Sequence, residues 1–257
     1  EDSPAQALLT YSPTSPGQER WLARTVDSSA RGLEEIRERI FAGLQIHRYD
    51  VILDVHAGTG LLTWEALRRT PEGSVWALEP DEALLQTLRD QSERLSELQR
   101  PILLHGELED LAALLEAHGV PHLRFDMVMG RNVLTRSDQW GARLPVLRSA
   151  LAPRATLRLA ERWPRASQRL YELVAAGTLA DELVERWRAA EEALYDRPDD
   201  PVVNWNADQL LAALAEAGFV NGEIESVRLN SDLLVTSTQV DRWFGGGREG
   251  RPSYAQG

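Results

Sequence analysis

The residues best suited to hold a ligand lie in one short turn that follows an apolar run. Residues 51–55 are apolar and rich in β-branched side chains, apart from Asp54, and Gly58 and Gly60 follow in a Gly-x-Gly pattern. Residues 61–67 then show helical periodicity, so the stretch predicts a buried strand, a tight turn and a helix. Small residues in such a turn let a ligand approach the backbone, and the start of the helix directs its N–H groups at that ligand.

An acidic residue ends the next apolar run. Residues 74–79 predict a second strand, and Glu79 at its end is followed by Pro80 and Asp81. A carboxylate here can accept hydrogen bonds from both hydroxyls of a ribose, worth roughly 1.5–3 kcal/mol for each bond to a charged group. Glu79 follows Gly58 at close to the ~20 residues expected of dinucleotide sites, so it indicates an adenosine-containing ligand without choosing which one. The structural alternative is a surface acid that caps the next helix beside Asp81.

Strands and helices alternate along the central part of the chain. Further strands are predicted at residues 101–105, 125–129 and 156–160, and helices at residues 81–98, 107–118 and 139–151. This alternation predicts an α/β fold with a doubly wound, mostly parallel sheet and right-handed crossovers. Ligands of such sheets bind at the carboxyl ends of the strands, where the strand order reverses.

The segments on either side of this alternation predict helical additions. Residues 18–44 carry a helical apolar stripe, which predicts a helix packed on the sheet. Residues 165–200 predict a helical insertion, for which a plain packing pair is one interpretation. Residues 207–217 predict a helix that Asn206 precedes.

The carboxyl-terminal part predicts a hairpin. Residues 223–229 and 233–238 are separated by a turn at residues 230–232, and the two added strands would bring the sheet to seven. The chain is therefore divided into a leader with N-terminal lid helices (1–44), a main domain (45–240) and a flexible tail (241–257).

The glycine turn resembles motif I of the class I S-adenosylmethionine-dependent methyltransferases, in which an apolar strand and an acid precede a glycine-rich turn. Asp54, Ala57, Gly58 and Gly60 match this motif, and His56 stands in place of its first glycine. The resemblance implies a Rossmann-like methyltransferase fold that binds S-adenosylmethionine. In this family a lid over the cofactor at residues 18–44 and a substrate-covering cap at residues 165–200 are the alternatives to plain packing helices. A terminal antiparallel hairpin is part of that fold and is not typical of dehydrogenases.

The resemblance extends to later turns. It places Glu79 and Pro80 at the ribose. It places Gly106, Glu107 and Leu108 where the family's acid receives the adenine amino group and the next residue flanks the ring, with Glu in place of the usual Asp. For this acidic stretch, a cluster that suits the dipole of the following helix is the structural alternative.

The turn after the fourth strand carries a further match. Arg131 and Asn132 stand where residues of chemotaxis-receptor glutamate methyltransferases line the methionine end of the cofactor and face the acceptor. The Asn/Asp-Pro-Pro-Tyr/Phe motif of adenine-amino methyltransferases is missing from this place. DNA adenine methylation is therefore disfavoured.

Composition narrows the classes of function. The 257 residues include no cysteine, which excludes disulfides, thiolate metal sites and cysteine nucleophiles. The five histidines are scattered along the chain, so no metal site is expected. The net charge of −12 argues against a broadly basic nucleic-acid surface, although a local arginine patch stays open. Without a bilayer-length apolar run or a signal core, the chain is expected to be cytoplasmic, with no membrane partner.

A second resemblance concerns the context of the chain. Residues 200–205 and 251–254 look like the C-terminal methyltransferase-like region fused to some bacterial AAA+ recombination-type ATPases. A bacterial protein with a fused or neighbouring ATPase domain is thus one expectation, in which this chain is a piece of a longer protein.

Three hypotheses about function result. The first is methyl transfer to an unidentified small-molecule or protein acceptor. The second is a non-catalytic S-adenosylmethionine-binding module of such a fusion protein. The third is an NAD-dependent dehydrogenase, whose fingerprint would have a glycine at the position of Thr63. Since the methyl of the cofactor is already activated, the enzyme mainly has to align the acceptor, which can supply up to roughly 7–11 kcal/mol. His56, Glu161 and Tyr171 are candidates for a general base by location, and no catalytic residue is assigned.

Overall fold

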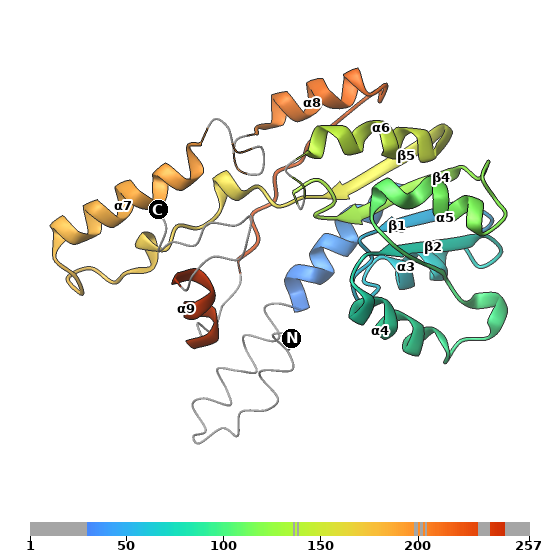
Figure 1. Cartoon of the computed structure of the whole chain (residues 1–257), viewed down its shortest axis with the longest axis horizontal. Helices are drawn as coiled ribbons and strands as arrows, with labels where there is room; N and C mark the ends of the chain where they lie inside the picture. Colours follow the sequence, from blue (N-terminus) through green and yellow to red (C-terminus); the bar gives the residue numbers. More distant parts are fainter. Residues whose placement is uncertain are drawn as a thin grey trace. The chain divides into compact units, whose positions relative to one another are not determined.

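A parallel sheet forms the centre of the structure. The computed structural model describes residues 30–135, 137, 139–197, 200, 203, 205–230 and 237–244. These residues contain a five-stranded sheet in the order β3-β2-β1-β4-β5, in which every neighbouring pair is parallel (Figure 1). The strands are β1 (Val51–Val55), β2 (Ser74–Glu79), β3 (Ile102–His105), β4 (Phe125–Arg131) and β5 (Leu151–Ala160). The strand order reverses between β1 and β4, which is where a doubly wound sheet leaves a crevice for a ligand.

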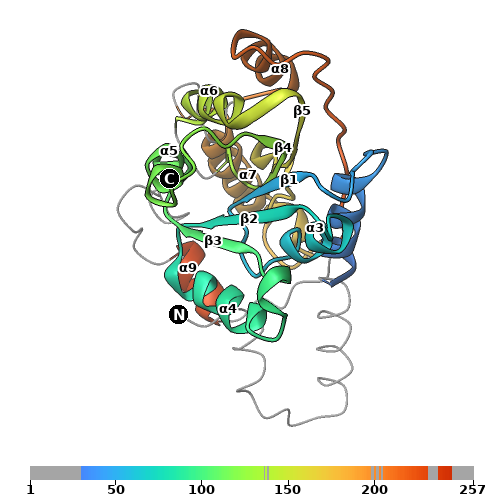
Figure 2. The ribbon, with the colours of Figure 1, turned by 90° about the vertical axis from the view of Figure 1, so that its right-hand side faces the viewer.

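Helices cover both faces of this sheet. The connections between consecutive strands contain α3 (Thr63–Arg69), α4 (Glu82–Ser92), α5 (Leu111–Ala117) and α6 (Trp140–Ala150), with a 3-10 turn, η2 (Leu108–Asp110), just before α5. Figure 2 shows α3 to the right of the sheet and α5 and α6 to the left. The doubly wound α/β fold predicted from the alternation of elements is thereby confirmed.

The strand residues alternate between two layers of core. On one face Leu53, Val55, Trp76 and Leu78 pack with side chains of the helices on that side, namely Leu111, Leu115, Leu144, Leu147 and Leu210. On the other face Ala77 packs with Ala57 and Leu88, and Trp64 and Leu103 lie against them. Both faces of β1 and β2 are therefore buried, which explains why these strands are continuous apolar runs in the sequence.

Local capping explains where the helices begin. Asp81 precedes α4 and its Oδ1 accepts hydrogen bonds from the N–H groups of Ala83 (2.9 Å) and Leu84 (3.1 Å). Asn206 precedes α8 (Ala207–Glu216) and accepts from Gln209 N at 2.9 Å, while the Gln209 side chain returns to Asn206 N at 3.0 Å. These are capping interactions that satisfy N–H groups otherwise left over at a helix start. The helix expected over residues 81–98 is shorter, since α4 ends at Ser92 and a 3-10 turn η1 (Glu97–Gln99) follows.

The predicted hairpin is wrong. Residues 222–230 form no strand, and the end of the second expected strand belongs to helix α9 (Ser237–Phe244), while residues 231–236 lie outside the described part of the chain. The apolar residues of the first expected strand are Ile224, Val227 and Leu229, and each keeps more than a third of its surface exposed. The spacing from Ile224 to Val227 breaks the two-residue period, so these side chains could not share one buried face. The described sheet thus has five strands rather than seven.

The described residues fall into two compact units. One comprises residues 37–135, 137, 139–167, 197, 200, 203 and 205–225 and holds the sheet, and the other comprises residues 30–36, 168–196, 226–230 and 237–244. Residues 30–41 are helical, whereas residues 1–29, which include most of the expected N-terminal lid, lie outside the described residues. No helix in the described part of the chain is long and apolar enough to cross a membrane.

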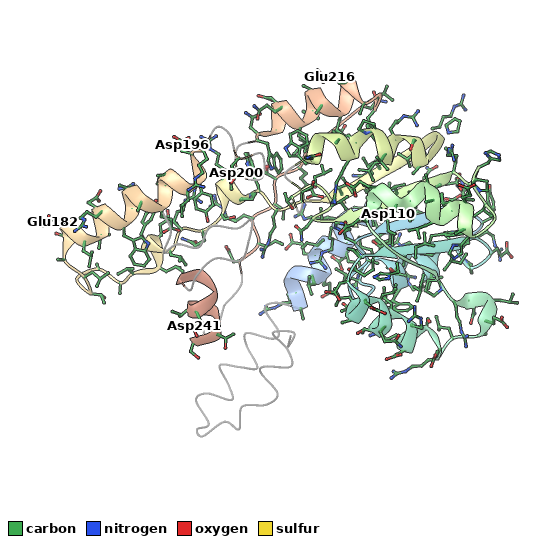
Figure 3. All side chains as sticks on the ribbon, in the orientation of Figure 1. Asp110, Glu182, Asp196, Asp200, Glu216 and Asp241 are labelled. Carbon is green, nitrogen blue, oxygen red and sulfur yellow. The ribbon has the colours of Figure 1, made fainter. Side chains whose placement is uncertain are left out.

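The second unit is built on helix α7 (Asp181–Tyr195), whose opposite ends are marked by Glu182 and Asp196 in Figure 3. The helical insertion expected over residues 165–200 is interrupted. It begins with two 3-10 turns, η3 (Pro164–Ala166) and η4 (Tyr171–Leu173), and α7 starts only after Gly177, whose φ of 79° suits glycine. Glu191 of α7 is buried and accepts hydrogen bonds from the N–H groups of Leu170 (2.8 Å) and Tyr171 (3.2 Å), which fixes η4 against the helix.

Candidate functional site

The turn after β1 has an unusual backbone. His56, Gly58 and Gly60 all have positive φ angles, of 57°, 60° and 88°. A Cβ added to Gly60 would lie 2.3 Å from Nε1 of Trp64 and 2.8 Å from Cδ2 of Leu88, so this position is filled by neighbouring side chains. A Cβ added to Gly58 would meet nothing nearer than the carbonyl oxygen of His56 at 4.0 Å. Gly60 therefore serves packing, and Gly58 leaves the backbone open to an approaching group.

Glu79 joins the end of β2 to this turn. Its side chain is completely buried, with Oε2 accepting from the N–H of Gly58 at 2.7 Å and Oε1 accepting from the N–H of Asp81 at 3.0 Å. A second link is the hydrogen bond from Ala57 N to Leu78 O at 3.1 Å. A carboxylate offers about four lone-pair positions, and two of them accept these backbone bonds. The expected neighbours of a ribose thus meet in space, and Glu79 already holds the turn in shape.

Asp54 lies at the floor of the same turn. It is buried, and its Oδ2 accepts a hydrogen bond from the Thr63 hydroxyl at 2.7 Å. Burial raises the pKa of Asp54 from 3.8 to about 7, against the opposing effects of the Thr63 hydrogen bonds and of the nearby Arg131 charge. Thr63 takes the place where a dinucleotide fingerprint has its third glycine, and its side chain fills the helix–strand contact that such a glycine would leave open.

The turn after β3 brings the next predicted residues to the same edge of the sheet. Gly106 donates its N–H to the Glu79 carbonyl at 3.4 Å, and the Pro80 carbonyl lies 3.1 Å from Nε2 of His105. Glu107 is half-exposed, with Oε2 at 3.6 Å from Nε2 of the buried His56. Leu108, which the resemblance places beside the adenine ring, is completely buried in the hydrophobic core.

The turn after β4 completes this edge. Arg131 ends β4 and acts electrostatically on Asp54. Asn132 has a left-handed φ of 53°, and its Oδ1 accepts from the N–H of Arg162 at 3.3 Å. The eleven residues singled out from the sequence therefore sit at the carboxyl ends of β1 to β4, although Leu108 points into the core and the Asn132 amide is bonded to backbone.

Glu161 fixes the loop that follows β4. Its carboxylate accepts from the N–H groups of Val133 (2.7 Å), Leu134 (3.2 Å) and Thr135 (3.0 Å), and from the Thr135 hydroxyl at 3.0 Å. Burial raises the pKa of Glu161, while these four hydrogen bonds favour the ionised form. Both oxygens of Glu161 accept hydrogen bonds from this loop. Glu161 therefore holds the loop in place, and it is not available as the general base that its position in the sequence suggested.

The Glu161→Gln variant should lose about 2–3 kcal/mol of unfolding free energy, because a glutamine turns one acceptor oxygen into an NH2 that faces N–H donors. Urea unfolding measures this loss. The matched control is Glu116→Gln, whose side chain is exposed on α5 and which should change the free energy by less than about 0.5 kcal/mol. Equal stability of the two variants would contradict the conclusion that Glu161 fixes this loop.

The other two candidates for a general base, His56 and Tyr171, also lie against other side chains of the protein. His56 is buried in the turn, with its ring beside Glu107. Tyr171 belongs to the second unit, where its hydroxyl donates to Glu192 at 2.7 Å, and this hydrogen bond raises the pKa of Tyr171. Within the described residues no group of three or more His, Asp or Glu side chains could hold a metal ion.

Two residues of this edge were not predicted. Trp64 covers Gly60, and its indole N–H donates to the Thr59 carbonyl at 3.2 Å. Arg143 of α6 is buried and reaches the turns after both β3 and β4. The signal for Arg143 is a charged residue directly before Leu144 on the apolar stripe of its helix, where a buried cation requires partners.

No family model matches the sequence. Similar solved structures include a SAM-dependent methyltransferase from Aquifex aeolicus, with 14% identity, a TM-score of 0.46 and coverage of 72% of this chain and 78% of that one. The glycopeptide N-methyltransferase MtfA shows 23% identity, a TM-score of 0.41 and coverage of 62% and 67%. Magnesium protoporphyrin IX methyltransferase from Synechocystis, solved with bound SAM, shows 12% identity, a TM-score of 0.39 and coverage of 56% and 62%.

Proposed function

We propose that this chain binds S-adenosylmethionine at the carboxyl edge of its sheet and transfers the methyl group to a small-molecule or protein acceptor. The observation that carries the proposal is the junction of β1 and β2. There the buried Glu79 carboxylate is bonded to the N–H of Gly58, at a position where an added Cβ would meet only the His56 carbonyl oxygen, at 4.0 Å. This junction stands next to the point of strand reversal, where ligands of doubly wound sheets bind.

The residues present fit an adenosyl group with an amino-acid tail. Gly58 leaves room for close backbone approach, and Glu79 supplies the carboxylate for ribose hydroxyls. Glu107 offers a half-exposed carboxylate to an amino group. Arg131 brings a positive charge to the other side of the turn, beside the buried Asp54, and this charge suits the carboxylate of a methionine tail.

In this reaction the main task of the protein is to position the acceptor relative to the methyl group. When bound, the cofactor supplies an activated methyl group on a sulfonium. The clamped loop at residues 132–135 fixes one wall of the site and lets the chain hold an acceptor in line with that group. The acceptor is unidentified, and a screen of candidate acceptors with a labelled methyl donor would find it. A fused or neighbouring AAA+ ATPase domain stays a prediction that nothing in the described residues tests.

A nicotinamide cofactor fits less well. The buried Thr63 side chain bonded to Asp54 occupies the contact that the third fingerprint glycine would leave open. Calorimetric titration with S-adenosylhomocysteine and with NADH separates the two ligands. We expect binding of the first and none of the second, and the reverse result would overturn the proposal.

Glu79→Gln should weaken S-adenosylhomocysteine binding by about 10- to 100-fold, because a ribose hydroxyl and the Gly58 N–H both lose a carboxylate acceptor. The same titration measures this change, and the thermal midpoint should fall as well. Glu82→Gln, an exposed glutamate in the first turn of α4, is the matched control and should bind like the unaltered chain. Unchanged affinity in Glu79→Gln would place the nucleoside elsewhere.

A further inference from the structure

Arg143 is a buried cation in an otherwise apolar part of α6. Its side chain is only 8% exposed, and its helix neighbours Leu144 and Leu147 are completely buried. A guanidinium removed from water in this way is costly unless its donors are paired. A helix that only packs on the sheet does not need an arginine at this buried position. The partners of Arg143 therefore indicate its role.

Those partners come from two different turns of the candidate site. Towards the turn after β3, Arg143 donates from Nε to Oε1 of Glu109 at 2.9 Å and from Nη2 to Oε2 of Glu107 at 3.3 Å. Nη2 also lies 3.4 Å from Oε2 of Glu109. Towards the turn after β4, Nη1 donates to the Val133 carbonyl at 2.6 Å. One side chain therefore ties together two loops that are separated along the chain.

The geometry restricts Glu107 most. Glu107 is half-exposed, yet Arg143 and His56 both lie against its Oε2, at 3.3 Å and 3.6 Å, and its backbone N–H donates to Asp110 Oδ2 at 3.0 Å. An exposed glutamate would otherwise sample several rotamers. Here Arg143 bonds one carboxylate oxygen of Glu107 and the His56 ring lies beside the same oxygen, which restricts the orientation of the carboxylate.

We propose that Arg143 is a positioning residue that makes the site selective for a nucleobase with an exocyclic amino group, by holding the Glu107 carboxylate as its acceptor. This inference rests on the proposed function. The planar fork of arginine is needed, because a lysine at this place has one nitrogen and cannot bond Glu107, Glu109 and the Val133 carbonyl in the same fixed plane.

The experiment compares two ligands that differ at the base. S-adenosylhomocysteine carries an amino group on the purine, and S-inosylhomocysteine carries a carbonyl oxygen there, which a fixed carboxylate repels. Calorimetry on the full chain should show the adenosyl ligand bound more tightly by about tenfold or more. In Arg143→Met this ratio should fall below about threefold, since Glu107 is no longer oriented. Arg148→Met, on the same helix, is the control and should keep the original ratio.

Each result bears on the inference in a distinct way. If Arg143→Met weakens both ligands equally, or if the unaltered chain binds both alike, the positioning role is overturned while the proposed function stands. If the unaltered chain binds neither ligand, the proposed function fails and the inference fails with it. Should Arg143→Met not fold, Arg143→Lys replaces it, with a reduced ratio expected and an unreduced ratio counting against the role.

Discussion

The Asp54→Asn variant is expected to lose a large part of the pH dependence of stability that the unaltered chain shows between about pH 4 and about pH 8. Burial raises the pKa of Asp54 from 3.8 to about 7, so the folded chain keeps a proton on this group where the unfolded chain has lost it. The folded state then binds more protons across this window. Stability contributed by Asp54 therefore falls as pH rises, by about 3–4 kcal/mol over the whole window.

Urea unfolding of both chains at several pH values measures this effect. An asparagine keeps an oxygen for the Thr63 hydroxyl and carries no proton to lose, so the difference in unfolding free energy should move in favour of Asp54→Asn as pH rises. Asp90→Asn, an exposed aspartate of α4, is the control and should follow the unaltered chain at every pH. A constant difference between Asp54→Asn and the unaltered chain would show that Asp54 titrates at its ordinary value.

The Gly60→Ala variant should be the most destabilised of the turn variants, by about 3 kcal/mol or more. Two costs add at this position. A Cβ would lie 2.3 Å from Trp64 Nε1 and 2.8 Å from Leu88 Cδ2, and the φ of 88° disfavours any residue with a side chain. Urea unfolding gives the loss, and a change in tryptophan fluorescence should accompany it because Trp64 must move.

Gly58→Ala is the matched comparison, since it makes the same substitution two residues earlier. Its φ of 60° costs about 1–2 kcal/mol, but its Cβ meets no atom nearer than 4.0 Å. This variant should fold and lose affinity for S-adenosylhomocysteine, because the new methyl group stands where the ligand would approach the backbone. Equal loss of stability in the two variants would contradict the packing described around Gly60.

Local sequence patterns were enough to predict several elements of this fold. The apolar runs that became β1 and β2 are buried on both faces, which makes them continuous and easy to recognise. The Gly-x-Gly turn and the Asn206 cap depend on backbone requirements that few residues meet. The hairpin failed for the converse reason: residues 223–229 do not alternate with a period of two, and propensity without a buried face does not make a strand.

The contacts at the edge of the sheet depend on residues that are far apart along the chain. Glu79 and Gly58 are 21 residues apart, Glu161 and Val133 are 28 apart, and Arg143 and Glu107 are 36 apart. No local pattern specifies such pairs, because an acid at the end of a strand looks the same whether it faces water, a helix start or a distant loop. The parallel order of the strands brings their carboxyl ends together, and the burial that follows leaves each charged group one set of partners. That burial gives Asp54 a raised pKa and makes Glu161 and Arg143 supports of the site.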